Sequence, residues 1–115
     1  MLVNYDLYFG GFSYEFRPGF NTSCHHTREH YDKLSNLMEQ LTEGNIVLTL
    51  RHLNQYRFAT LLFVELANFS ELTAAEIYSN HKYRDYESLF RRMGANSIGF
   101  TVNSDVTIIG FDIIA

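Results

Sequence analysis

The hydrophobic and polar positions at the start of the chain alternate on both sides of Gly10-Gly11. Strict alternation over four to eight residues is typical of a half-buried strand, and two glycines supply the positive φ angles of a two-residue turn. The pattern therefore predicts an N-terminal β-hairpin unit over residues 1–19, closed by Pro18-Gly19. The hairpin would turn Tyr5, Leu7, Phe9, Phe12, Tyr14 and Phe16 inward, and Asp6, Tyr8 and Glu15 outward.

The middle of the chain shows the three-and-four residue spacing of amphipathic helices. This spacing predicts helices over about residues 25–43, 55–68 and 84–93. A further helix is expected to start at Thr73, because Thr73 and Glu76 form a capping box. Residues 45–50 (NIVLTL) are rich in β-branched side chains, which favours a strand over a helix.

The C-terminal residues alternate again, over 97–102 and 106–114, about Asn103-Ser104-Asp105. This pattern predicts a second hairpin with a three-residue loop. The expected fold class is α+β, with N- and C-terminal β-hairpins packed against three to four helices in a single domain, residues 1–115.

Composition and charge narrow the classes of function. The 115 residues are 46% hydrophobic, which is enough for one compact domain. The sequence shows no signal segment and no apolar stretch long enough for a membrane span, and it has one cysteine, so we expect a cytoplasmic protein without a membrane partner. The net charge of −4 disfavours binding to nucleic-acid phosphates.

The segment SCHHTREHY, residues 23–31, concentrates three histidines and the only cysteine. Its HTREH string fits H-x-x-E-H, the inverted zinc-protease signature, and a helix starting near Ser23 would place His26 and His30 one turn apart. A small zinc-binding protein or hydrolase is therefore one alternative, although the sequence marks neither Glu65 nor Glu71 as a third ligand. We expect instead an exposed helix start, no cofactor and no catalytic group, including Cys24.

From residue 55 onward, the order of predicted elements resembles a winged helix-turn-helix domain, over roughly residues 55–112 within a half that extends to 114. The resemblance implies a recognition helix at residues 83–93 and a wing at 97–112. It also implies that Lys82, Arg84, Ser88 and Arg91 face DNA. A winged helix-turn-helix DNA-binding regulator is thus a further alternative.

The balance of charges in this half favours protein binding over DNA binding, because the cations of residues 70–94 are matched by carboxylates and the wing has no Lys or Arg. We therefore expect a small, acidic, non-enzymatic interaction protein that inhibits or regulates a larger, nucleic-acid-processing partner. Antirestriction and anti-CRISPR proteins of phages are of this kind. Asp6, Tyr8 and Glu15 are the expected contacts with a basic surface of the partner. A homodimer formed through an exposed hairpin edge is also compatible with the sequence.

Overall fold

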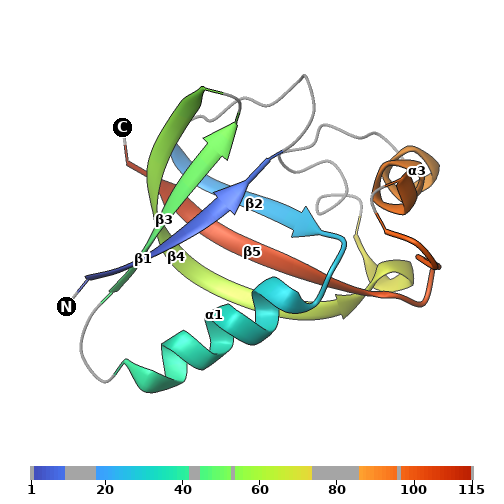
Figure 1. Ribbon diagram of the computed structural model, residues 1–115, viewed down its shortest axis with the longest axis horizontal. Helices are drawn as coiled ribbons and strands as arrows, with labels where there is room; N and C mark the ends of the chain where they lie inside the picture. The colour runs from blue at the N-terminus through green and yellow to red at the C-terminus, as the bar shows by residue number, and fades with distance from the viewer. Residues whose placement is uncertain are drawn as a thin grey trace.

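A five-stranded mixed sheet forms the centre of the computed structural model, which describes residues 2–9, 18–41, 45–52, 54–73, 86–95 and 97–114 (Figure 1). The strand order is β1-β3-β4-β5-β2. β1 and β3 run parallel, and the other neighbouring pairs are antiparallel. The strands are β1 (Leu2–Tyr8), β2 (Gly19–His25), β3 (Asn45–His52), β4 (Gln55–Asn68) and β5 (Asp105–Ile113). The expected α+β class is confirmed.

The sheet curls, so that β1 and β2 approach each other although they are at opposite ends of the strand order (Figure 1). The ring of Phe9, directly after β1, lies 5.7 Å from the ring of His25 at the end of β2. Helix α1 (Glu29–Gln40) follows β2 and ties it to β1, because the hydroxyl of Tyr5 is 2.8 Å from Nδ1 of His30. The curl gives the sheet an enclosed inner face and an outer face.

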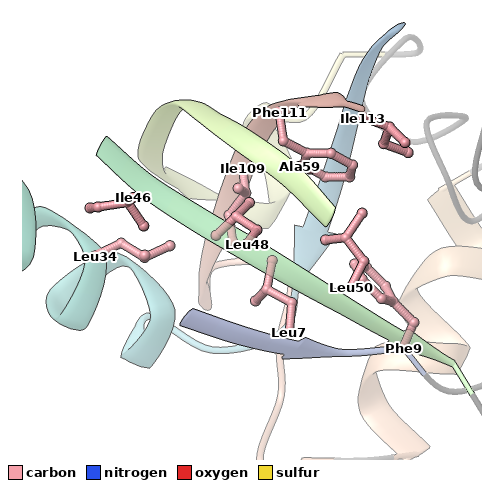
Figure 2. Packing of buried hydrophobic residues seen from close by; sticks show 10 residues of the cluster. All are labelled: Leu7, Phe9, Leu34, Ile46, Leu48, Leu50, Ala59, Ile109, Phe111 and Ile113. Carbon is pink, nitrogen blue, oxygen red and sulfur yellow. The ribbon is translucent and has the colours of Figure 1, made fainter. Parts of the chain in front are cut away.

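The inner face holds the larger hydrophobic core, into which α1 inserts the fully buried Leu34 (Figure 2). Every second residue of β1, β3 and β5 points into it, as the two-residue period of a strand requires. The inner core comprises Leu7, Phe9, Leu34, Ile46, Leu48, Leu50, Ala59, Ile109, Phe111 and Ile113.

A second core lies on the outer face at one end of the sheet, under helix α3 (Tyr86–Ala95) and the short 3-10 helix η1 (Phe69–Glu71). It comprises Cys24, Phe69, Leu72, Leu89, Met93, Val106 and Ile108. β5 is therefore buried on both faces from Val106 to Phe111, which explains why every residue of this segment except Thr107 is apolar or glycine.

The number of helices was predicted wrongly. The described residues contain two α-helices, α1 and α3, rather than three or four. Residues 55–68, predicted as a helix, form the long strand β4. A shift of register between Leu61 and Phe63 interrupts the alternation of inward and outward side chains. The apolar residues of this segment are therefore spaced as they would be on a helix.

The C-terminal hairpin and the winged-helix resemblance are also wrong. Residues 97–104 form turns, and β5 pairs instead with β4 and β2. The segment expected to be a wing therefore supplies a central strand, and the segment expected to be a buried helix supplies its neighbour. A mixed sheet with this order is not a helix-turn-helix unit.

Other expectations agree with the structure or fall outside it. The strand at 45–50 and the final helix are confirmed as β3 and α3, and the first strand of the predicted N-terminal hairpin is confirmed as β1. The helix expected from residue 25 begins at Glu29, because residues 19–25 form β2. The second arm of the N-terminal hairpin, with Glu15, lies outside the described residues, as do Glu76 of the capping box, Lys82 and Arg84.

Candidate functional site: the outer face of the sheet

One row of side chains crosses the outer face on all five strands. Asn4 is paired with Val47, Val47 with Thr60, and Thr60 with Asp112. Asp112 is in turn paired with Phe20 on β2. The row shows that the outer face is continuous from one edge of the sheet to the other.

Two further rows lie beside it on β1, β3 and β4. The nearer row contains Asp6, Thr49 and Phe58, and the farther row contains Tyr8, Arg51 and Tyr56. We call the following set of side chains the outer-face patch: Asp6, Tyr8, Phe20, Arg51, Tyr56, Phe58 and Asp112.

The aromatic members of the outer-face patch are exposed. Tyr8 is 72% exposed, Phe20 65%, Tyr56 53% and Phe58 48%. The rings of Tyr56 and Phe58 meet edge to face at 5.5 Å between centroids. Large side chains of this kind are buried in most folded proteins, so their accumulation on one face marks a surface for contact.

A groove of about 350 Å³ lies within the outer-face patch, lined by Asn4, Thr49, Arg51, Tyr56 and Phe58. Its floor is held by polar contacts between β1 and β3. Thr49 Oγ1 donates to Asn4 Oδ1 at 2.6 Å, and Arg51 Nε donates to Asp6 Oδ1 at 3.1 Å. These contacts keep the groove in shape while its aromatic rim stays open to solvent.

The carboxylates of the outer face differ in whether they are paired with a cation. Asp6 is neutralised by Arg51, whereas Asp112 and Glu65 are exposed on the same face. Among the residues that the structure describes, neither Asp112 nor Glu65 has an ion-pair partner. The outer face thus presents two uncompensated carboxylates beside its aromatic side chains.

Two of the three residues expected to contact a partner lie in this patch. Asp6 and Tyr8 point outward from β1, while Glu15 lies outside the described residues. The other exposed members of the patch were not predicted from the sequence: Phe20, Tyr56, Phe58 and Asp112. The alternation of Tyr56, Phe58 and Thr60 with Arg57 and Ala59 was the signal that could have shown a strand there.

The helix does not begin near Ser23, because the histidine segment starts in β2 and reaches α1 only at Glu29. Ser23 and Cys24 are buried in β2, His26 lies in the following turn, and His30 lies in the first turn of α1. The spacing of His26 and His30 by one helical turn was therefore wrong. A search of the described residues found no group of three or more His, Cys, Asp and Glu side chains arranged to hold a metal ion.

Glu29, the acidic residue of the HTREH string, makes an ion pair within α1. Lys33 Nζ donates to Glu29 Oε1 at 2.6 Å, and this hydrogen bond lowers the pKa of the Glu29 carboxyl. Burial lowers the pKa of the neighbouring His30 imidazole. Of the other carboxylates considered as ligands, Glu65 lies on the outer face and Glu71 is exposed in η1.

Of the four residues expected to face DNA, the structure describes Ser88 and Arg91, both on α3. Arg91 is exposed on α3, where its guanidinium makes a 2.8 Å ion pair with Glu87. Ser88 is half-buried on the same helix, and Lys82 and Arg84 lie outside the described residues. Residues 97–112 form turns and the central strand β5 rather than a wing, so the winged-helix resemblance no longer assigns α3 the role of a recognition helix.

The comparisons with known proteins found no matching family model, no similar curated protein and no similar solved structure. The described helices are too short or too polar to cross a membrane.

Proposed function

We propose that this protein binds another protein through the outer-face patch and thereby inhibits or regulates it. The observation that carries the proposal is the exposure of Tyr8, Phe20, Tyr56 and Phe58 on one continuous face of the sheet. Exposed aromatic side chains provide large contact areas at a low cost in side-chain entropy, and they are enriched among residues that dominate binding energy.

The charge of the same face supports a basic partner. Asp112 and Glu65 add uncompensated negative charge to the outer face, and the whole chain has a net charge of −4. Complementary charge speeds association with a positively charged surface. Such surfaces bind nucleic acids, so the proposed partner is a larger nucleic-acid-processing protein whose binding surface is covered.

A binding measurement on a partner isolated by affinity capture tests this function. Phe58→Ser removes an aromatic side chain from the patch, and Met38→Ser is its matched control, because Met38 is 44% exposed on α1. We expect Phe58→Ser to weaken binding by about tenfold or more, with faster dissociation, and Met38→Ser to leave the affinity unchanged. Equal affinity of both variants and the wild type would contradict the proposal.

The electrostatic part of the proposal has its own test. Asp112→Asn removes a charge that has no ion-pair partner in the described part of the chain, whereas Asp32→Asn removes a carboxylate on α1 that is paired with Arg28. Asp112→Asn should slow association and reduce its dependence on salt, and Asp32→Asn should do neither. A partner whose association rate rises with added salt would exclude the basic surface.

A further inference from the structure

A hydrogen bond to Asp6 orients the guanidinium of Arg51, which lines the groove in the outer-face patch. Nε of Arg51, on β3, donates to Oδ1 of Asp6 on the neighbouring strand β1 at 3.1 Å. The other two nitrogens, Nη1 and Nη2, have no hydrogen-bond or ion-pair partner in the part of the chain that the structure describes. Because every guanidinium nitrogen is a donor, the lining of the groove includes two parallel N–H donors that no described group uses.

Two aromatic rings lie beside this guanidinium. Tyr56 is the cross-strand neighbour of Arg51, and Phe58 is the cross-strand neighbour of Thr49. The two rings meet edge to face at 5.5 Å between centroids, and both line the groove. Thr49 is only 3% exposed, so the groove is deeper between the rings and β1 than its aromatic rim. A flat ligand can therefore lie against an aromatic ring with its edge toward Arg51.

The charge around the groove distinguishes an anionic from a neutral ligand. Asp6 neutralises Arg51, so this ion pair has no net charge. Asp112 and Glu65 add two negative charges to the same face, and the whole chain has a net charge of −4. An anion would thus be repelled by the face that surrounds Arg51. A neutral group with two adjacent acceptors can use the same donors without this repulsion.

We propose that the groove binds a guanine base, held by Nη1 and Nη2 of Arg51 and stacked against the aromatic pair of Tyr56 and Phe58. O6 and N7 of guanine are adjacent acceptors in one plane, and bidentate contact of Arg with this edge is the commonest specific contact between a protein and a base. Aromatic side chains provide the surfaces on which unpaired bases stack. The groove volume of about 350 Å³ suits a ligand of this size.

The inference goes beyond the proposed function, because it requires no protein partner. Titration of the isolated chain with guanosine, followed by protein NMR, tests it independently of partner capture. Saturable shifts of the backbone amide signals of Arg51, Tyr56 and Phe58 are expected. The absence of saturable shifts at these positions would overturn the proposal and would leave the protein-binding function to its own test.

Two other nucleosides test which edge of the base is recognised. Inosine retains O6 and N7, so it should bind within about threefold of guanosine. Adenosine has an amino group in place of O6, which would face the N–H donors of Arg51, so it should bind at least about tenfold more weakly. Equal binding of adenosine and guanosine would contradict recognition by Arg51. Tighter binding of benzoate than of guanosine would show that the groove takes a carboxylate instead.

A short single-stranded oligonucleotide with one guanine among uridines distinguishes the source of the base. Tighter binding than that of guanosine would identify an unpaired base within a strand. Weaker binding would identify a free nucleoside, because the phosphates are repelled by the acidic face, and added salt should then reduce the difference.

Arg51→Lys retains the positive charge but loses the pair of parallel donors, so it should weaken guanosine binding by about tenfold or more. Arg91→Lys is the matched control, because Arg91 is paired with Glu87 on α3 and does not line the groove. Replacing both Tyr56 and Phe58 by Leu removes the stacking surface and should weaken binding by about fivefold or more. Unchanged guanosine affinity in either groove variant would overturn the proposal, with melting temperatures verifying that each variant is folded.

Asp6 is a positioning residue in this site, since it holds Arg51 without lining the groove itself. Asp6→Ala removes the acceptor for Nε of Arg51 and should weaken guanosine binding. Asp6→Asn keeps an oxygen acceptor at the same place and should restore most of the affinity. Equal loss in both variants would show that Asp6 does not act by orienting the guanidinium.

Discussion

Gly110 in β5 lies directly under the ring of Phe63 in β4. A Cβ atom at position 110 would overlap three carbon atoms of that ring, and Phe63 is itself in contact with Phe20 on the outer face. Gly110→Ala should therefore lower the free energy of unfolding by about 1–3 kcal/mol, measured by urea denaturation. Gly94→Ala in α3 is the control, because a Cβ there meets no atom within 4 Å.

A double mutant can show whether the ring of Phe63 causes the loss of stability in Gly110→Ala. If the ring of Phe63 causes the clash, Phe63→Ala should restore part of the stability lost in Gly110→Ala, so that the two changes are not additive. Fully additive costs would mean that the contact between these residues is not what excludes a side chain at position 110.

His30 gives the stability of the protein a dependence on pH. Its pKa is lowered from the ordinary value of 6.5 by burial, so the unfolded chain binds a proton at a higher pH than the folded chain does. Stability should thus fall as the pH drops below about 6.5, by at most about 1.4 kcal/mol per pH unit from this one group. Denaturation at several pH values should show a smaller slope for His30→Gln than for the wild type.

At the scale of elements, the fully buried Thr107 connects β5 to the start of α1. Its Oγ1 donates to the carbonyl of Thr27 at 2.6 Å and accepts from the backbone N–H of Tyr31 at 3.3 Å. Thr107→Val keeps the shape of the side chain but leaves both backbone groups without this partner. We expect a loss of about 1–3 kcal/mol in unfolding free energy.

Thr60→Val is the control for this effect, because Thr60 is a half-buried threonine on the outer face with no hydrogen bond of its side chain in the described part of the chain. It should change stability by no more than about 0.5 kcal/mol. A similar loss in both variants would show that the link from β5 to α1 is not specific to Thr107.

The elements show how far the sequence could predict the fold. β1, β3 and α3 were predictable, because each follows a regular period or composition. β4 was not, since its bulge between Leu61 and Phe63 produces helix-like spacing, and β5 was assigned the wrong neighbour because pairing between distant strands leaves no local signal. β2 combines polar and small residues, GFNTSCH, and its partner β5 determines its conformation.

The sequence predicted residues of the candidate site only on β1, where it also predicted the strand. The alternation of side chains correctly predicted that Asp6 and Tyr8 point outward from β1. Arg51, the ion-pair partner of Asp6, is 45 residues away, and no pattern in the sequence indicates this pair. Tyr56 and Phe58 were placed on a helix because the spacing of apolar residues over 55–68 resembles that of a helix. Their exposure depends on the pairing of β3 with β4, which the structure supplies.

At the scale of the whole molecule, the curled sheet separates two surfaces with different chemistry. The outer face is aromatic with uncompensated carboxylates, whereas a cavity at the ends of β1 and β2 is lined by histidines and Arg92. Where β1 and β2 approach each other, the rings of Phe9 and His25 are in contact. Tyr8 belongs to the outer-face patch and also lines the cavity, so the two surfaces meet at the end of β1.

Site-specific photo-crosslinking can show whether the outer face is the surface that contacts the partner. A benzophenone side chain would replace Phe58 in one sample and Met38 on α1 in the other, since the two positions are similarly exposed. We expect a crosslinked basic protein from position 58, lost when Phe20→Ser and Tyr56→Ser are added, and no such product from position 38. Equal crosslinking from both positions, or crosslinking from position 38 alone, would contradict binding through the outer face.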